Sequence, residues 1–294
     1  TRHNQQIQFD ARFIVDATGP RGFLPRALTL SAAPLPGFPP TQALYTHFSG
    51  VHRANLSVAI PPQELPYDPD DAAVHHIFDG GWIWVLRFRN GMTSAGVAAR
   101  EDVAENLNLA EGSAAWDRLL QRLPAVRAQF KDAVGEREWT HLRRLSFRSG
   151  TICSNNWVLL PSAAGFVDPL LSTGFPMTLL GVSRLAEIIE QDWNTERFVH
   201  KRHDSALQTD DELLATESLI ASLYANMGDF RLFVTLTLLY FAAASYSETM
   251  RRLVRTQAAS SFLLHDDSQF GPLLRQLCER AMDCDGVDKS RALQ

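Results

Sequence analysis

The sequence predicts a mixed α/β protein, with an α+β arrangement in this chain, in which strands of both directions precede a long helical region. Three observations predict this class. The apolar run Arg12–Ala17 (RFIVDA) stops at a Gly-Pro turn, as a buried parallel strand does. Several β-type runs between residues 42 and 97 are typical of an antiparallel sheet. After Gly174, apolar residues recur at helical spacing.

Composition limits the kinds of protein this chain can be. Its 294 residues, 45% hydrophobic and 21% charged, suit one or two globular domains. A net charge of −5 disfavours a nucleic-acid partner, whose phosphates require basic residues. The three cysteines include no C-x-x-C pair, and the first residues lack the order of a signal peptide. We therefore expect a cytoplasmic protein with reduced thiols and no metal site.

The first half of the chain is expected to hold most of the strands. Ile7–Phe9 and Arg12–Ala17 read as two strands, and proline-rich connectors follow at residues 34–40 and 61–69. Asn90-Gly91 lies between two β-type runs, which is the strongest short signal for a hairpin. The β-type runs of this region cover residues 43–51, 56–60, 75–88 and 92–98.

The second half is expected to be mainly helical. Residues 111–131 predict one amphipathic helix, broken or kinked at Pro124, and strands resume around 142–147 and 152–160. A helix follows Gly174, and further helices begin at Thr195, with one apolar face formed by Leu213, Ile220, Leu223 and Met227. The expected segments are residues 1–40, 41–160, 161–193 and 194–294.

The longest uncharged apolar run, residues 232–246, has 15 residues. A membrane span needs about 18 or more, so we expect a buried helix and no membrane contact. Among the histidines, His200 and His203 stand at i and i+3 on the solvated face of a predicted helix. His75 and His76 are expected on opposite strand faces, and His47 and His52 either line a pocket or lie at a sheet edge.

Three stretches together resemble the flavin-dependent halogenase and FAD-dependent monooxygenase family. They are Val15-Asp-Ala-Thr-Gly19, Gly81-Trp-Ile-Trp84 and the long stretch LPSAAGFVDPLLSTG at residues 160–174. The resemblance implies an incomplete FAD-binding domain of the aromatic-hydroxylase type, an antiparallel-sheet substrate domain and a helical C-terminal region. It also implies an aromatic or apolar small-molecule substrate and a separate flavin reductase as partner.

The resemblance assigns roles to particular residues but names no catalytic residue. Trp82 and Trp84, which share one strand face by period two, would either line the substrate or belong to the core. The helix start after the loop suits the negative pyrimidine edge of a reduced flavin, because helix N-termini carry partial positive charge. Gly174 would let the backbone approach the flat ring. The residues expected at the cofactor are Gly19, Ser162, Ala163, Gly165, Asp168, Pro169, Ser172, Thr173, Gly174 and Phe175.

The loop departs from the family pattern at several positions. Pro161-Ser162 replaces the family's Gly-Asp, so a neutral and shorter hydroxyl stands where a carboxylate normally meets the ribityl chain of FAD. Leu171 replaces the Glu of tryptophan halogenases, and Leu86-Arg87 replaces their Ile-Pro. These changes argue against tryptophan as the substrate. Residues 172–174 still resemble the family's halide-binding backbone, which leaves halogenation of another substrate open.

The family's G-x-G-x-x-G cradle has no counterpart in this sequence. No two of the 17 glycines lie two positions apart, and the halogenases' catalytic lysine belongs to the same absent N-terminal part. We therefore expect a C-terminal fragment that is inactive alone; an intact protein that lost the motif is the alternative. Two other functions stay open: a flavin dehydrogenase resembling geranylgeranyl reductases, acting on a lipid, and a non-catalytic module that binds apolar ligands.

Overall fold

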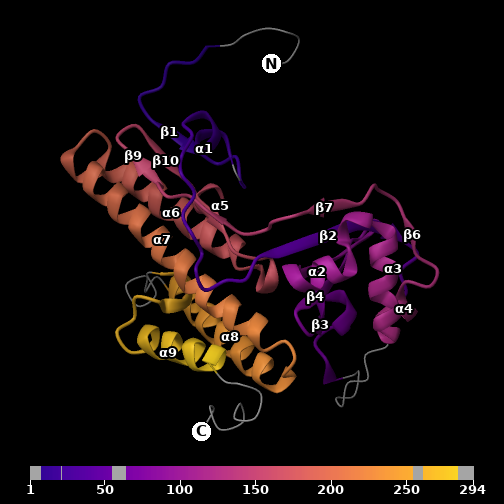
Figure 1. The fold of residues 1–294 in the computed structure, drawn as a ribbon. Helices are drawn as coiled ribbons and strands as arrows, with labels where there is room; N and C mark the ends of the chain where they lie inside the picture. The colour runs from indigo at the N-terminus through magenta and orange to yellow at the C-terminus, as the bar shows by residue number, and fades with distance from the viewer. Residues whose placement is uncertain (1–7, 21, 55–63, 254–260, 284–294) are drawn as a thin grey trace. The chain divides into compact units, whose positions relative to one another are not determined.

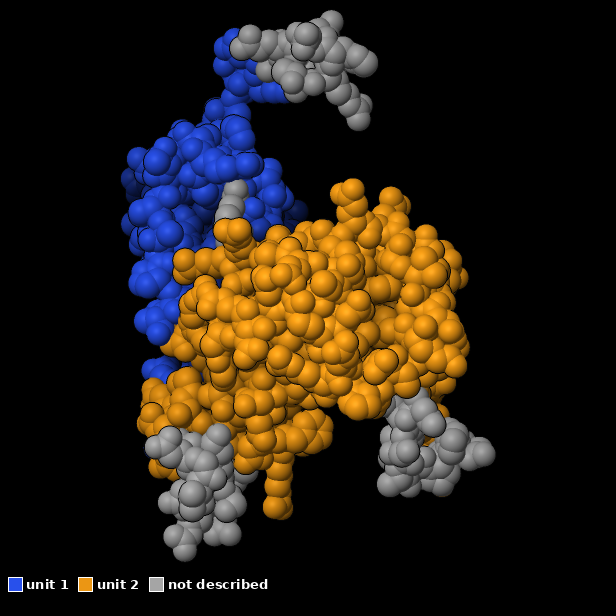
Figure 2. All heavy atoms as spheres, turned by 45° about the vertical axis from the view of Figure 1, so that its right-hand side comes forward, with its two compact units in different colours: residues 1–36, 146–218, 240–276 blue, residues 37–145, 219–239, 277–294 orange. Residues whose placement is uncertain are grey.

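The computed structural model describes residues 8–20, 22–54, 64–253 and 261–283, and the chain divides into two compact units (Figures 1 and 2). Unit 1 comprises residues 1–36, 146–218 and 240–276. Unit 2 comprises residues 37–145, 219–239 and 277–294. Each unit thus joins segments that lie far apart in the sequence. The four segments expected from the sequence stay a prediction.

Unit 1 contains two small sheets. β1 (Ile14–Asp16) pairs in parallel with β10 (Trp157–Leu159), which pairs antiparallel with β9 (Cys153–Ser154). β8 (Phe147–Arg148) pairs antiparallel with β11 (Gly165–Phe166). The parallel strand expected within residues 12–17 is confirmed, although only Asp16 of β1 is buried.

The expected strand at residues 7–9 is not confirmed. Ile7 lies outside the described residues, and neither Gln8 nor Phe9 belongs to a strand. Phe9 is 84% exposed, so no packing surface holds this stretch in an extended pairing.

Helices form the rest of unit 1. The helix expected after Gly174 is confirmed, and Pro176 lies in its first turn, where a missing amide is harmless. The helix that follows Gly174 packs tightly against the short helix that begins at Pro161, because a Cβ at Gly181 would lie 2.4 Å from Cγ of Pro161. The elements wholly within unit 1 are α1 (Phe23–Ala27), α5 (Pro161–Ala164), η4 (Leu170–Ser172), α6 (Gly174–Asp192) and η6 (Phe262–Leu264).

Three further helices contain the boundaries between the units. They are α7 (Glu196–Ala225), α8 (Phe230–Arg252) and α9 (Phe270–Asp283). The helical region expected from Thr195 onward is therefore confirmed for the described residues. The expected apolar face is confirmed as well, because Leu213, Ile220, Leu223 and Met227 are all buried.

Unit 2 is built on an antiparallel sheet with the strand order β3–β4–β5–β2–β6, to which β7 adds by pairing with β2. The hairpin expected at Asn90-Gly91 is confirmed, since it joins β4 to β5 and Gly91 has a φ of 82°. The strands are β2 (Thr41–Ser49), β3 (Val74–Phe78), β4 (Gly81–Arg87), β5 (Thr93–Arg100), β6 (Val134–Gly135) and β7 (Thr140–Leu142). The run expected at residues 56–60 lies outside the described residues.

One face of this sheet carries the core of unit 2, and helices cover it (Figure 1). The helix expected over residues 111–131 is two helices, with Pro124 opening the second. Helix α2 was not predicted because its seven residues include too few apolar positions to show a period. The elements on this side are η2 (Pro69–Asp71), α2 (Glu101–Leu107), η3 (Leu109–Glu111), α3 (Ser113–Arg122) and α4 (Pro124–Gln129).

Two expectations from the sequence need correction. Residues 143–146 form no strand, because the chain leaves unit 2 for unit 1 there, between β7 and β8. The run at residues 232–246 is helical, but α8 is only partly buried: a third of its most apolar window is covered. By length and composition alone, α8 is also long and apolar enough to cross a membrane. Its exposed side includes Phe230, Leu238 and Phe241.

Candidate functional site

The carboxyl ends of β1 and β10 lie side by side in unit 1. Asp16 is opposite Leu159 in the parallel register, and the amide of Leu160 donates to the carbonyl of Asp16 at 3.0 Å. Parallel strands end at the same edge of a sheet, which is where open α/β sheets bind their ligands. The turn that contains Gly19 and the helix that contains Ser162 therefore start from one edge (Figure 1).

The carboxylate of Asp16 organises the turn after β1. Its Oδ1 accepts from the amide and the hydroxyl of Thr18 at 2.8 and 2.6 Å, and its Oδ2 accepts from the amide of Leu24 at 2.7 Å. Burial favours a higher pKa, but these hydrogen bonds outweigh it and hold the pKa of Asp16 below its ordinary value. The D-x-T spacing signals such a turn, yet the sequence reasoning assigned Asp16 no role of its own.

Gly19 is a glycine because its backbone requires one. Its φ is 77°, in the left-handed region, and a Cβ added there would meet no atom within 4 Å. The space beside the Cα of Gly19, where a side chain would otherwise lie, is therefore open. Gly19 is half-buried and available to a ligand at this sheet edge.

The loop after α5 is held by its own polar groups. Asp168 is fully buried, and its Oδ1 accepts from the amide of Leu170 at 3.0 Å. The amide of Ser172 donates to the carbonyl of Pro169, also at 3.0 Å. Asp168 and Pro169 thus build the loop's frame, which fixes the position of the residues that follow.

The backbone strain of this loop lies at two non-glycine residues. Leu171 has a φ of 59° and Ser172 a φ of 55°, both in the left-handed region that side chains disfavour. Gly174 opens α6 and is not among the glycines with positive φ. Strain of this kind costs about 1–3 kcal/mol per residue and concentrates at functional sites.

Some of the residues expected at the cofactor are buried and support the loop, and the others are exposed at least in part. Ala163 and Thr173 are buried, and Gly165 serves close packing, since a Cβ there would lie 2.6 Å from Cδ1 of Leu213. The residues that reach the surface, at least in part, are Gly19, Ser162, Pro169, Ser172, Gly174 and Phe175. Contact between any of these residues and a cofactor stays a prediction.

The surface residues fit a flat, partly anionic group such as a flavin. The amides of Gly174 and Phe175 lie in the first turn of α6 and have no acceptor within that helix. They point partial positive charge at the loop's outer side. At Gly174 a Cβ would meet only the ring of Phe166, at 3.5 Å, so the backbone is accessible from the other directions.

In unit 2, the two expected substrate-lining tryptophans share a sheet face but differ in exposure. Their ring centroids are 5.6 Å apart. Trp82 is 1% exposed, and its Nε1 donates to the hydroxyl oxygen of Tyr224 at 3.1 Å. Trp84 is half-buried and lies over Gly96, where a Cβ would come within 2.4 Å of its ring. A substrate-lining role stays a prediction for both, and Trp84 is the more accessible.

Other aromatic and polar side chains occupy the same face as Trp84. Tyr45 lies 6.0 Å from Trp84, between ring centroids, and His47 stacks on Phe88 at 6.3 Å. His47 and Phe88 also line a cavity of about 500 Å³ together with Asn90, Met92 and Arg137. His47 therefore lies beside a cavity, and a part in substrate binding stays a prediction for it. His52 is exposed and contacts Asp132.

His75 and His76 point to opposite faces of β3, as expected. The ring of His75 lies 4.6 Å from that of Trp82, and His76 contacts the side-chain amide of Gln129 at 3.2 Å. Burial lowers the pKa of His75 to about 4, helped by the nearby His76. His75 is therefore neutral at pH 7.

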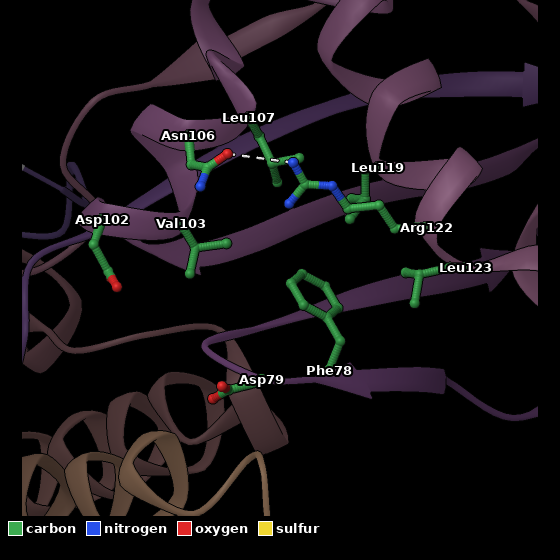
Figure 3. A pocket seen from close by; sticks show the side chains of 9 residues that line it. All are labelled: Phe78, Asp79, Asp102, Val103, Asn106, Leu107, Leu119, Arg122 and Leu123. Atoms are coloured by element: carbon green, nitrogen blue, oxygen red, sulfur yellow. Dashed lines mark hydrogen bonds between the residues drawn. The ribbon is translucent and has the colours of Figure 1, made fainter.

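The helix-covered face of the sheet has a separate cavity of about 280 Å³ (Figure 3). Its apolar walls include Leu107 and Leu119, which belong to the core of unit 2. Arg122 also lines the cavity, and its guanidinium donates to the side-chain oxygen of Asn106 at 3.3 Å. This cavity therefore lies on the face opposite Trp84. In the part of the chain that the structure describes, no group of three or more metal-ligating side chains gathers.

The sequence profile described as tryptophan halogenase matches residues 2–213. The chain belongs to the tryptophan halogenase family. The resemblance inferred from residues 15–19, 81–84 and 160–174 is confirmed, and so is the predicted mixed α/β fold class.

Two relatives of this chain are named as halogenases. Monodechloroaminopyrrolnitrin halogenase PrnC of Pseudomonas fluorescens is 28% identical over 235 residues, 78% of this chain and 41% of PrnC. Tetracycline 7-halogenase of Kitasatospora aureofaciens is 32% identical over 229 residues, 73% of this chain and 41% of that enzyme. The chain thus spans about two-fifths of the length of these relatives.

A solved halogenase shares the fold of this family member. The structure of halogenase PltM in complex with phloroglucinol and FAD has a TM-score of 0.76 and 23% identity, and the match covers 96% of this chain and 62% of PltM. At this identity the likeness shows the fold alone.

Proposed function

We propose that the complete protein is an FAD-dependent oxidoreductase of the halogenase type that acts on an aromatic or apolar small molecule. The parallel register of β1 and β10 carries the proposal, because it brings the Gly19 turn and the helix that contains Ser162 to one sheet edge in a chain of this family. A separate flavin reductase as partner and a cytoplasmic location belong to the same proposal.

FAD, when bound, supplies the oxygen chemistry that halogenation requires. The chain's own residues would hold and orient it. The hydroxyl of Ser162 would hydrogen-bond the ribityl chain, and the amides of Gly174 and Phe175 would stabilise the negative edge of the ring. The backbone at residues 172–174 would hold a halide ion, as the resemblance to the family implies.

The open face of the sheet in unit 2 is the proposed substrate wall. Trp84 and Tyr45 offer flat apolar surfaces, which suit a planar ring. His47 adds one polar group. Tetracycline 7-halogenase, a relative that is 32% identical, is named for a ring compound, which supports this substrate class.

The test compares this chain with the protein encoded by its complete coding sequence. We expect this chain alone to lose FAD on dialysis, because the ADP half of FAD needs an N-terminal βαβ unit of about 30 residues or more. The complete protein should retain FAD and, with a flavin reductase, oxygen and chloride or bromide, should halogenate phenolic test compounds. A complete protein that retains no flavin would overturn the proposal.

One observation favours a second candidate, a flavin dehydrogenase acting on a lipid. Helix α8 exposes several apolar side chains, among them Leu238 at 62% and Phe241 at 52%. Such a surface suits an acyl or prenyl chain. Halide and oxygen dependence separates the candidates: a dehydrogenase oxidises or reduces its substrate with neither.

A further inference from the structure

Tyr240 of helix α8 contacts the strained part of the loop before α6. Its hydroxyl donates to the carbonyl oxygen of Leu171 at 2.9 Å. The two residues are 69 positions apart in sequence, and both belong to unit 1. Tyr240 is 6% exposed and lies beyond residues 2–213, the range that the family's sequence profile matches.

The contact falls on the residue whose conformation most needs support. Leu171 and the following Ser172 both have left-handed backbones, and two such non-glycine residues in succession persist only where surrounding groups hold them. The hydrogen bonds at Asp168 and Pro169 join residues within the loop, so they do not fix the loop relative to the rest of unit 1. The bond from Tyr240 instead anchors the loop to a separate helix.

The same contact affects the start of α6. In a helix that extended further toward its N-terminus, the carbonyl of Leu171 would accept from the amide of Phe175. The left-handed turn directs this carbonyl to Tyr240 instead. The amide of Phe175 is then free of an acceptor within its own helix, and it stays available to an anion in front of the loop.

The phenol of Tyr240 suits the role of a fixed donor. Burial raises the pKa of this phenol, so it stays protonated across the pH range in which proteins work. Its ring packs edge-on against Phe241 with centroids 5.2 Å apart, which leaves the hydroxyl in a defined place.

We propose that Tyr240 is a positioning residue that holds Leu171 and Ser172 in their left-handed conformations and thereby places the amides at the start of α6 for flavin and halide. This inference rests on the proposed function. It extends the site to a helix that the family's sequence profile does not match.

The first test uses this chain and does not depend on any ligand. Tyr240→Phe removes the hydroxyl and keeps the ring, and we expect amide hydrogen exchange in peptides covering residues 168–177 to become about five- to tenfold faster. Peptides from the sheet of unit 2 should not change. Tyr246→Phe, at a 46% exposed position of the same helix, is the matched control. Unchanged exchange in residues 168–177 would overturn the proposal.

A double-variant cycle separates loop positioning from general packing. Glycine adopts the left-handed conformation without strain, so Leu171→Gly removes most of the need for an anchor. We expect Tyr240→Phe to speed exchange less than twofold in the Leu171→Gly background. Equal effects in both backgrounds would contradict the proposed role.

The second test uses the complete protein, with FAD and chloride as probes. Tyr240→Phe should raise the flavin dissociation constant or the chloride KM about fivefold or more, with kcat changed less than twofold and the thermal midpoint close to that of Tyr246→Phe. Faster exchange with unchanged flavin and chloride affinity would overturn the role of Tyr240 and leave the proposed function standing. If the complete protein binds neither FAD nor chloride, the proposed function fails, and the ligand role of Tyr240 fails with it.

Discussion

The indole nitrogen of Trp82 donates a hydrogen bond to the hydroxyl oxygen of Tyr224, and both side chains are 1% exposed. Tyr224 in turn meets Phe38 edge to face, with ring centroids 5.5 Å apart. Trp82 belongs to β4, and its side chain is covered by Tyr224 at the end of α7. Trp84, two residues along the same face, has no such cover and stays half-buried.

The two tryptophans should respond differently to substitution. Trp82→Phe leaves a void and the hydroxyl of Tyr224 without its donor, so we expect a loss of about 2–4 kcal/mol in the free energy of unfolding. Trp84→Phe should cost about 1 kcal/mol and should weaken substrate binding in the complete protein. Urea denaturation of both variants measures the difference. Equal losses would show that Trp84 is core as well.

The stability of unit 2 should depend on pH through His75. Unfolded His75 binds a proton near pH 6.5, whereas the folded residue does so near pH 4. The contribution of neutral His75 to the free energy of unfolding is therefore fully present above pH 6.5. It is lost as pH drops from 6.5 to 4, and the loss is on the order of 3 kcal/mol. Thermal midpoints between pH 7 and pH 4.5 measure this loss. His75→Phe should make the loss of stability on acidification smaller, and part of what remains comes from His76, whose pKa burial also lowers. An unchanged loss would contradict the assignment to His75.

Asp16 should make its contribution only while ionised. Its pKa lies below the ordinary 3.8, so the stability that its carboxylate provides is present above pH 3.8 and is lost as pH falls through the folded pKa. Asp16→Ala removes the acceptor of three hydrogen bonds and should cost about 2–3 kcal/mol at pH 7. Chemical denaturation at pH 7 and at pH 2.5 checks both statements. A variant as stable as the wild type at pH 7 would contradict them.

Gly174 and Gly181 offer a matched test of site against fold. Gly181→Ala forces a Cβ against Pro161 and should destabilise the chain by about 1–3 kcal/mol. Gly174→Val meets only an ordinary contact with Phe166 and should cost less than about 1 kcal/mol. In the complete protein, however, Gly174→Val should raise the flavin dissociation constant at least tenfold. Unchanged flavin affinity would mean that residues 165–175 form only a turn.

Glu212 should be critical for unit 1 although it lies outside the site. Its carboxylate is fully buried, accepts from Arg184 at 2.6 and 2.8 Å, and accepts from the amide of Phe262 at 2.9 Å. Glu212→Gln leaves the partly buried guanidinium of Arg184 without its counter-charge and should cost about 3 kcal/mol. Glu248→Gln, in the exposed pair with Arg252, should change stability by less than about 1 kcal/mol. Chemical denaturation of both variants measures the two losses in the free energy of unfolding, and equal losses would contradict this prediction.

The sequence by itself determined the local elements and the family. Asn90-Gly91 specified its hairpin because a tight turn with positive φ depends on residues that are adjacent in the chain. Pro176 and the apolar spacing after it located α6 for the same reason. The stretch at residues 160–174 carried the family because its order of residues is long and specific.

Only the tertiary structure decided which side of each element is used. Period two places Trp82 and Trp84 on one face, but the cover that Tyr224 gives to Trp82 comes from a helix 142 residues away. The sequence pointed to Gly174 as the special backbone position, whereas the left-handed residues are Leu171 and Ser172. No local rule predicts such a conformation in a leucine, because it is disfavoured in isolation. It exists here because Asp168, Pro169 and the distant Tyr240 together hold the chain in place, and such contacts arise only when the fold brings these segments together.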